Sequence, residues 1–354
     1  MKIGIYDPYL DDLGGGEKYM MTIAACLSQN NEVSVLWDRT KDIEALKERF
    51  DLDLSRVTLA ENIFSPRFSF IKRLFATSKF DAIIFLSDGS IPFSLSRKLL
   101  IHIQQPLEQL QSKSLKDRFK LSRVNRFFCN SLYTKSFIDK KFDLKTAILY
   151  PPVTLHYKDV KKENIILHVG RFRVKNVQVG DYKKQGFMVE VFKKMSQKGL
   201  KNWKFVIATS IKKEDKKEFE QLQQQAKGFP IEFFINKNNK ELWGMYNKAK
   251  IYWHASGFGE DLKKNPEYAE HFGISTVEAM GAGCVPVVIN AGGQKEIVTE
   301  NVNGLLWNSE NELMEKTNKL IDDAKLLDKL SKEAMVTAQK FSKEKFCENL
   351  YKLL

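Results

Sequence analysis

The chain has 354 residues, of which 43% are hydrophobic and 29% charged, so it holds enough apolar material for two folded domains. Its 25 Phe, 11 Tyr and 5 Trp exclude intrinsic disorder, and its longest apolar runs are far shorter than a membrane-spanning helix requires. The formal net charge of +13 is unevenly distributed. Residues 1–65 carry 7 basic and 12 acidic side chains, whereas residues 66–145 carry 16 basic and 6 acidic ones.

Cysteine spacing and the start of the chain both bear on location. Cys26, Cys129, Cys284 and Cys347 lie far apart and form no C-x-x-C pair. Such spacing is typical of buried thiols in a reducing cytoplasm and disfavours both disulfides and a thiolate zinc site. Asp7 interrupts the short apolar start, which argues against a secretory signal. We therefore expect a cytoplasmic protein.

The first half of the chain alternates apolar runs with helical patterns, which is typical of an α/β domain. A glycine turn at residues 14–16 separates the first strand from the first helix. The strands are predicted at residues 2–6, 32–37, 81–86, 99–103 and 126–129, and the helices at residues 17–27 and around 43–50.

Adjacent prolines, Pro151 and Pro152, mark a linker, because neither fits inside a helix or a central strand. After them the α/β alternation restarts, with strands predicted at residues 164–169, 204–208, 231–234, 249–254 and 285–288, and a helix at 186–194. The tail from residue 311 is mostly helical in pattern. We expect two Rossmann-like domains facing a central cleft, at residues 1–152 and 153–335, with residues 336–354 as a helix that crosses back to the first.

The glycine turn after the first strand is not a dinucleotide fingerprint. Tyr19 occupies the position of the third glycine, where a bulky side chain would block close helix–strand packing, so NAD binding is disfavoured. The backbone N–H groups of Gly15 and Gly16, at a helix N-terminus, remain available to a phosphate or polar ligand. A plain turn without a ligand is the alternative.

The most informative segment is E-H-F-G-I-S-T-V-E-A-M-G-A-G at residues 270–283. It resembles the signature of the retaining glycosyltransferases of family 4, which have the GT-B fold and two glutamates separated by seven residues. The resemblance implies that Glu270 contacts the hydroxyls of the donor sugar and that Glu278 holds the ribose of the nucleotide. Gly273 permits close approach of the backbone, and a helix beginning near Ile274 and Ser275 would point its free N–H groups at the donor.

Further residues of this second half resemble the phosphate-binding parts of the family. Gly292 and Gly293 match its diglycine turn, whose amides lie near the donor phosphates. Arg171, at the end of a predicted strand, matches its arginine, and Lys183 or Lys184 matches its lysine. Cations are needed there because breaking the glycosidic bond leaves a diphosphate with growing negative charge.

In the first half, the predicted strand at residues 99–103 ends at the expected edge of the cleft. Members of the family often place a histidine near the donor sugar and acceptor there, which implies His102, or Gln104 if the register differs by two. A histidine held inside the sheet is equally compatible with the pattern. Asp51 and Asp53 match a D-x-D metal clamp but lie in a loop-like acidic stretch, and the five histidines show no ligand spacing. We predict neither a metal nor a cofactor.

Taken over most of the chain, the resemblance implies a retaining, metal-independent enzyme. It would move a sugar, expected to be a hexose, from a nucleoside-diphosphate sugar to a glycan or lipid-linked acceptor. The product would serve surface polysaccharide or glycolipid synthesis. A sugar-nucleotide epimerase of the same architecture is one alternative. A non-catalytic sugar-nucleotide-binding protein is another.

Basic and apolar side chains crowd together at residues 113–126. One interpretation is a surface that docks on anionic lipid headgroups, which would place the protein peripherally on the inner face of the membrane. A solvated helix face in a lysine-rich chain explains the pattern as well. We expect no nucleic-acid partner, because the chain carries no recognition motif.

Overall fold

The computed structural model describes residues 1–12, 14–110, 115–174 and 181–354, and of residues 115 and 116 the backbone alone. The chain forms two compact units, one of Met1–Pro152 together with Lys343–Leu354 and the other of Val153–Ser342. The division therefore falls directly after the two adjacent prolines. The second unit continues past the predicted boundary at residue 335, and of the predicted C-terminal segment only residues 343–354 belong to the first unit.

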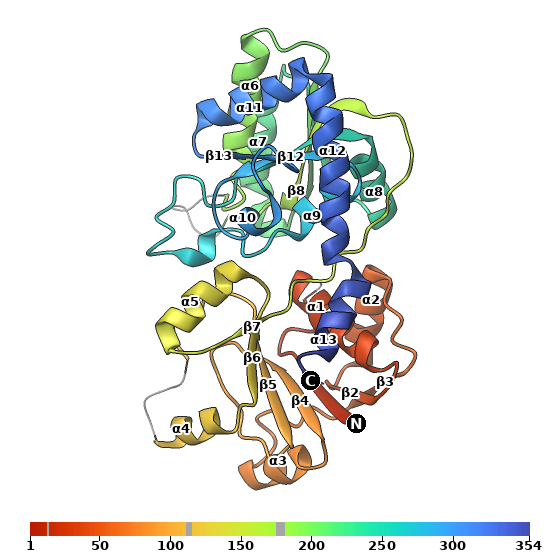
Figure 1. Cartoon of the computed structure of the whole chain (residues 1–354), viewed down its shortest axis with the longest axis vertical. Helices are drawn as coiled ribbons and strands as arrows, with labels where there is room; N and C mark the ends of the chain where they lie inside the picture. The colour runs from red at the N-terminus through yellow and green to blue at the C-terminus, as the bar shows by residue number, and fades with distance from the viewer. Residues whose placement is uncertain (13, 111–114, 175–180) are drawn as a thin grey trace. The chain divides into compact units, whose positions relative to one another are not determined.

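The first unit is built around a parallel sheet of seven strands in the order β3-β2-β1-β4-β5-β6-β7 (Figure 1). Its strands are β1 (Lys2–Tyr6), β2 (Glu32–Leu36), β3 (Val57–Ala60), β4 (Ala82–Leu86), β5 (Lys98–Ile103), β6 (Arg126–Cys129) and β7 (Ala147–Ile148). Its helices are α1 (Gly15–Leu27), α2 (Thr40–Phe50), α3 (Phe70–Thr77), α4 (Leu115–Ser122), α5 (Leu132–Phe142) and α13 (Lys343–Tyr351).

Both faces of this sheet are buried, which explains why its central strands are apolar throughout. All five residues of β4 are buried. Ile84 packs with α1 and α13 in one core cluster, while its neighbour Ile83 belongs to a second cluster with Phe85 and Ile101. Successive side chains of a strand point to opposite faces, so the two clusters cover the two sides of the sheet.

Four elements of the first unit, namely β3, β7, α3 and α5, have no counterpart in the predicted series, and one element begins earlier than predicted. β3 is an edge strand with two exposed residues, and it lacks the apolar alternation that predicts a strand. α3 was not predicted, although its apolar residues Phe70, Ile71, Leu74 and Phe75 recur at helical spacing. α1 begins at Gly15, which places Gly15 and Gly16 in the first helical turn rather than in the preceding turn.

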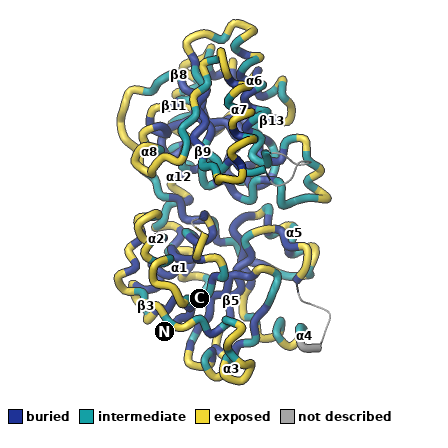
Figure 2. Tube along the Cα trace, turned by 180° about the vertical axis from the view of Figure 1, so that it is seen from behind, coloured by how far each residue is buried: buried dark blue, intermediate teal, exposed yellow. Residues whose placement is uncertain are grey.

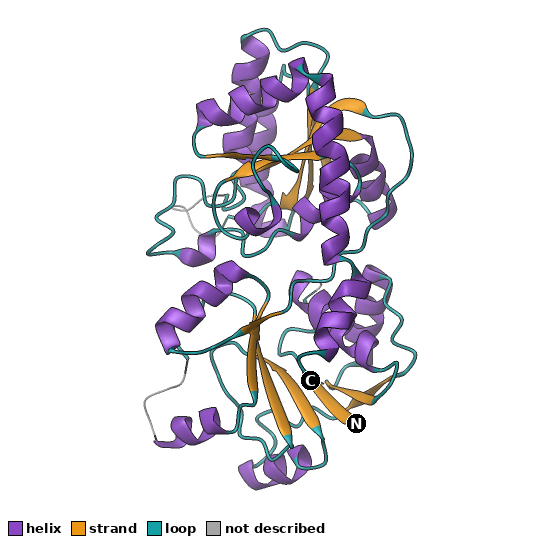
Figure 3. Cartoon of the chain, in the orientation of Figure 1, coloured by secondary structure: helices purple, strands orange, loops and turns teal. Residues whose placement is uncertain are grey.

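The second unit repeats the arrangement with a parallel sheet of six strands in the order β10-β9-β8-β11-β12-β13 (Figure 3). Its strands are β8 (Glu163–Arg171), β9 (Lys204–Ser210), β10 (Ile231–Ile235), β11 (Ala249–His254), β12 (Val285–Ile289) and β13 (Leu305–Trp307). Its α-helices are α6 (Gln185–Gln197), α7 (Lys216–Ala226), α8 (Asn239–Lys248), α9 (Ile274–Gly281), α10 (Gln294–Ile297), α11 (Glu310–Asp322) and α12 (Ala324–Ala338). Its 3₁₀ turns are η1 (Lys213–Asp215), η2 (Pro266–Tyr268) and η3 (Gln339–Phe341).

Aromatic side chains fill the core of the second unit. Trp253 of β11 lies 5.2 Å from Phe205 of β9 between ring centroids, and both side chains are fully buried. Trp307 of β13 is also fully buried. No helix in the described residues is long and apolar enough to cross a membrane.

A disulfide joins the two ends of the first unit. Cys26 at the end of α1 is bonded to Cys347 of α13, across 321 positions of sequence. The expectation of four free thiols is therefore wrong for this pair, while Cys129 and Cys284 are free and buried. Linear spacing could not reveal the bond, because the two cysteines meet only when the last helix packs on the first.

We expect thiol titration to detect this disulfide directly. Denatured, unreduced protein should react at two thiols, those of Cys129 and Cys284, and reduction before denaturation should raise the number to four. Cys347→Ser should also lower the midpoint of thermal unfolding. The cross-link restricts the unfolded chain and so typically adds about 2–4 kcal/mol to the free energy of unfolding. Four reactive thiols in the unreduced protein would contradict the bond.

Candidate active site

A buried carboxylate lies at the centre of the polar groups in the second unit. Glu270, in the segment before α9, accepts from the Nζ of Lys183 at 2.6 Å between nitrogen and Oε2. The same oxygen lies 2.9 Å from Nε2 of His254, at the end of β11. The Glu270 and Lys183 side chains are only 18% and 16% exposed. Three segments far apart in sequence therefore converge on one carboxylate.

The charges of this cluster stabilise one another. Burial alone would raise the pKa of Glu270, but the Lys183 ammonium and the His254 ring outweigh it and hold that pKa well below its usual range. Burial likewise tends to lower the pKa of Lys183, yet the Glu270 carboxylate raises it overall. Burial lowers the pKa of His254, so its ring is neutral near pH 7. The structure thus holds an ion pair of Lys183 and Glu270 beside a neutral imidazole.

The diglycine turn fixes the backbone on either side of Glu270. The N–H of Gly293 donates to the carbonyl oxygen of Glu270 at 2.7 Å. A Cβ at Gly293 would lie 2.5 Å from the carbonyl oxygen of His271 and 2.5 Å from the Cα of Phe272, so no larger residue fits. A Cβ at Gly292 would collide with the Glu270 carbonyl in the same way. The two glycines are therefore required for this close approach of two backbones.

Helix α9 presents its N-terminus at the same place. Gly273 caps it with a φ of 119°, a conformation that favours glycine, and the helix begins at Ile274. Its first N–H groups therefore have no partners inside the helix and are oriented to meet an anion or a hydroxyl. Ser275 is fixed by Tyr252, whose hydroxyl lies 2.8 Å from the serine Oγ.

Glu278 lies one turn further along α9 and is held separately. The buried Tyr246 of α8 donates its hydroxyl to Oε2 of Glu278 at 3.0 Å. The two glutamates of the motif therefore have different partners, Glu270 a lysine and a histidine, and Glu278 a tyrosine.

The cations predicted for phosphate binding lie around Glu270. Arg171 ends β8 and its charge acts on Lys183. Lys184, the N-terminal capping residue of α6, forms an ion pair with Glu260 instead. The two neighbouring lysines thus face different carboxylates, and only Lys183 contacts the motif.

The charged loop at residues 257–269 is anchored to the second unit by an aromatic contact and an ion pair. Phe258 packs against Phe187 of α6 at 4.3 Å and against Trp307 at 5.2 Å between ring centroids. The ion pair of Glu260 with Lys184 adds a second attachment.

The structure adds polar residues that the sequence did not identify. His254 was predicted only as part of a strand, yet it contacts Glu270. Gln294, at the start of α10, is fully buried, and neither atom of its side-chain amide has a hydrogen-bond partner. Buried polar groups are nearly always paired, so an unpaired amide beside Gly273 indicates a place where a polar ligand or water belongs. Its only sequence signal is its position directly after the two glycines.

The residues predicted in the first unit lie in a separate constellation. A Cβ at Gly16 would overlap the side-chain amide of Gln104, so Gln104 lies directly against the first turn of α1. His102 is fully buried, with its ring stacked 4.3 Å from Tyr19 and 4.8 Å from Phe128. Burial lowers the pKa of His102 to about 3. The geometry thus brings Gln104 to the glycine turn and leaves His102 inside the sheet.

Asp7, directly after β1, is a buried carboxyl group at the carboxyl end of the first sheet's strands. It is fully buried, and its Oδ2 has no hydrogen-bond partner, while Oδ1 accepts from the N–H of Tyr9 at 2.8 Å. Burial, with a smaller contribution from the nearby Glu17, raises the pKa of Asp7 to about 7.

The D-x-D sequence is a surface turn. Asp51 ends α2 in a left-handed conformation with a φ of 51°. Asp53 accepts from the hydroxyl and the N–H of Ser55, at 2.6 and 3.0 Å. Both carboxylates are thus part of the local turn geometry.

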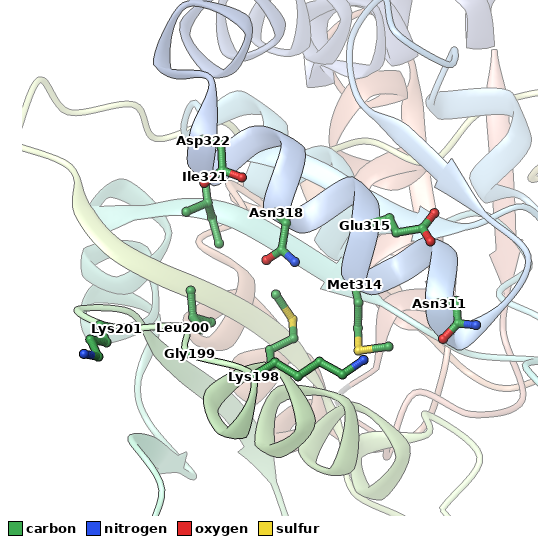
Figure 4. Close-up of a pocket in the computed structure, with 11 residues that line it drawn as sticks. Lys198, Gly199, Leu200, Lys201, Asn311, Met314, Glu315, Asn318, Ile321 and Asp322 are labelled. Carbon is green, nitrogen blue, oxygen red and sulfur yellow. The ribbon is translucent and has the colours of Figure 1, made fainter.

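A surface cavity of about 450 Å³ lies elsewhere in the second unit, between the end of α6 and α11 (Figure 4). Its lining residues include Met195, Lys198, Met314 and Glu315. It shares no residue with the cluster around Glu270.

Comparisons with known proteins identify the family of the chain. Residues 156–336 match the family described as glycosyl transferases group 1, and the chain belongs to that family. The whole chain is 23% identical to the GDP-Man:Man(3)GlcNAc(2)-PP-Dol alpha-1,2-mannosyltransferase of Dictyostelium discoideum and spans 84% of its length. Over 57% of the chain it is 26% identical to the human protein of that name, and this match spans 42% of the human protein.

The fold is shared with solved glycosyltransferases. The structure of Anabaena Alr3699/HepE in complex with UDP superposes over 100% of this chain and 99% of its own, with a TM-score of 0.71 at 17% identity. The protein therefore has the GT-B fold, as the sequence predicted.

We expect Gly293→Ala to displace the segment that carries Glu270. The added methyl group would meet two backbones, so the variant should lose about 1–3 kcal/mol of stability and most of its affinity for a sugar nucleotide. Gly244→Ala in α8 is the matched control, because nothing lies within 4 Å of its added Cβ and alanine favours a helix. Urea unfolding and nucleotide titration measure both effects, and equal behaviour of the two variants would disprove the argument.

The raised pKa of Asp7 should make the first unit less stable as pH rises. Between its usual pKa of 3.8 and its folded pKa of about 7, the folded state binds more protons than the unfolded state. The free energy of unfolding should therefore fall across that window, by a few kcal/mol at most, and level off above it. Asp7→Asn should remove this slope. A stability difference between variant and wild type that is constant from pH 4 to pH 8 would contradict it.

Proposed function

We propose that the protein transfers a hexose from a nucleoside-diphosphate sugar to a glycan acceptor carried on a lipid. The transfer retains the anomeric configuration, needs no metal ion and serves the synthesis of a surface polysaccharide or glycolipid. The observation that carries the proposal is the buried cluster of Glu270, Lys183 and His254 at the N-terminus of α9, in a chain of this family.

In this proposal, positively charged side chains of the cluster act on the phosphates where other transferases use a metal ion. Arg171 and Lys183 would pair with the two phosphates and stabilise the charge that builds up as the diphosphate leaves. Backbone N–H groups at Gly292 and the start of α9 would donate to the same phosphate oxygens, whereas the N–H of Gly293, also predicted for this role, is engaged by the Glu270 carbonyl. Lys183 is bound to Glu270 in the donor-free chain, so the donor would share or replace that partner.

The two glutamates accept hydrogen bonds from different parts of the donor in this proposal. Glu270, ionised because Lys183 holds its pKa low, would accept from hydroxyls of the sugar ring. Glu278, oriented by Tyr246, would accept from the ribose hydroxyls.

The reaction breaks the bond between the anomeric carbon and the phosphate oxygen, and forms one between that carbon and the acceptor oxygen. For retention the acceptor hydroxyl attacks from the face that the diphosphate leaves, and its proton passes to the departing phosphate oxygen. The second unit holds the donor, and the first unit binds the acceptor beside Gly16 and Gln104.

The choice of a lipid-linked acceptor rests on the relatives. The Dictyostelium protein, over 84% of whose length this chain aligns, is named for a GDP-mannose donor and a dolichol-diphosphate glycan acceptor. GDP-mannose is therefore the first donor to test, beside UDP- and dTDP-linked sugars.

A donor panel followed by transfer tests the proposal. One nucleotide sugar should raise the midpoint of thermal unfolding, and with a lipid-linked glycan it should give a product with the donor's anomeric configuration by NMR, unaffected by EDTA. Arg171→Ala and Glu278→Ala should each lower kcat/KM by about a hundredfold or more while the fold persists. An inverted product, or conversion of the donor without acceptor, would refute the proposal.

The two adjacent lysines provide the internal control. Lys183→Met should abolish both transfer and the donor-dependent shift, because Lys183 lies in the cluster. Lys184→Met removes the same charge one residue away but breaks only the contact with Glu260, so it should retain most activity. Equal losses in both variants would show that the assignment of the phosphate lysine is wrong.

A further inference from the structure

Large apolar side chains lie exposed on two helices of the first unit. On α3, Phe70 is 52% exposed, Ile71 64% and Phe75 68%, and on α4 Phe119 is 55% exposed. Figure 2 shows α3 as largely exposed chain at the surface of the first unit. Together with Phe93, which lies between them, these side chains form what we call the α3–α4 face.

These residues form one continuous surface. The ring of Phe93, in the segment after β4, lies 5.1 Å from Phe70 and 6.0 Å from Phe119 between centroids. The same segment is attached to α3, because the N–H of Leu95 donates to Oγ1 of the buried Thr77 at 3.0 Å. The two helices and the segment between them are therefore held together independently of the exposed rings.

The core does not require the exposed side chains. α3 is attached by its other side, where Arg73 donates to the backbone carbonyls of Ile63, Phe64 and Ser65 and where Ala76 packs on the core. Apolar side chains exposed next to one another are uncommon on a folded monomer and mark a surface that meets another apolar phase.

Basic side chains surround the face. Lys72 of α3 and Arg118 of α4 are exposed, as are Lys79 just after α3 and Arg123 just after α4. Lys120 lies 4.9 Å above the ring of Phe93. The nearby Asp117 is already engaged by Lys120 at 3.6 Å. An apolar centre with a cationic rim matches the surface of an anionic bilayer, which has acyl chains beneath negatively charged headgroups.

We propose that the α3–α4 face is a docking surface for an anionic lipid bilayer, with Phe70, Ile71, Phe75 and Phe119 entering the headgroup region. The described part of the basic segment predicted from sequence at residues 113–126, with Arg118, Phe119, Lys120 and Arg123, forms one side of this surface. Its Lys113 lies outside the described residues, as does the side chain of Lys116. α3, which was not predicted, supplies three of the four apolar contacts. The inference does not rest on the proposed transfer reaction, since it concerns binding alone.

Co-sedimentation of the whole protein with vesicles tests the proposal. Wild type should bind vesicles made of two thirds phosphatidylcholine and one third phosphatidylglycerol. It should bind vesicles of phosphatidylcholine alone much more weakly. The triple variant Phe70→Ser, Ile71→Ser, Phe75→Ser should lose affinity at least tenfold. The matched control is Val302→Ser with Val336→Ser, whose side chains are 49% and 63% exposed in the second unit. It should bind as wild type does.

The charge contribution is measured separately. Lys72→Glu with Lys79→Glu should weaken binding and reduce its dependence on salt, whereas Lys216→Glu with Lys217→Glu in α7 should not. Unchanged thermal unfolding would show that each variant folds. Three results would overturn the proposal: no binding by wild type, binding that the serine variant retains, or a dimer of wild type that the serine variant dissociates. The last would assign the face to a second copy of the chain.

Discussion

A single buried carboxylate constrains most of the second unit. Glu270 is too enclosed to be ionised without partners, because moving a charge out of water costs several kcal/mol unless it is paired. Its side chain is paired with Lys183, from the connection between β8 and α6, and with His254 at the end of β11. Its backbone carbonyl accepts from Gly293, after β12. Three connections at the carboxyl ends of neighbouring strands are thus joined through one residue.

This arrangement explains how a site for a charged ligand exists before the ligand arrives. A lysine near a glutamate is already desolvated and oriented, so a diphosphate does not have to dehydrate it from bulk water. The ion pair also balances the site electrically in the donor-free chain. A diphosphate brings additional negative charge, which Arg171 and the N-terminus of α9 are positioned to offset in our proposal.

Much of this architecture could be predicted from the sequence, for local reasons. The buried strands of a parallel sheet are runs of apolar residues, so β4, β5 and β11 were predicted to within a residue or so. The motif at residues 270–283 predicted the start of α9, because a glycine directly before a helical pattern marks the N-terminus of a helix. Tyr19, which disfavoured a dinucleotide fingerprint, is indeed a core residue stacked on His102.

The remaining features depend on contacts between residues distant in sequence. The disulfide forms only because α13 packs on α1, 321 positions away in sequence. No pattern around either cysteine predicts that contact. His254 contacts Glu270 only because β11 ends beside the segment before α9. β3 is a partly exposed edge strand, so it shows no apolar alternation. His102 and Gln104 are two residues apart, so strand alternation directs both toward the same face of the sheet. His102 lies within β5 and stacks on Tyr19 of α1, whereas Gln104, just past the end of β5 at Ile103, meets the first turn of α1.

The carboxyl ends of the strands hold acidic side chains in the first sheet, whereas in the second sheet they hold Glu270 together with Arg171 and Lys183. Asp7 follows β1, and Asp88 follows β4, with Glu17 in the first turn of α1. Carboxylates repel a diphosphate but accept hydrogen bonds from sugar hydroxyls, so this edge suits an uncharged glycan. Arg171 and Lys183 give the second sheet the reverse preference. Part of the positive charge of residues 66–145 lies around the exposed rings of α3 and α4, where in our proposal an anionic surface would meet it; its members there are Lys72, Lys79, Arg118, Lys120 and Arg123.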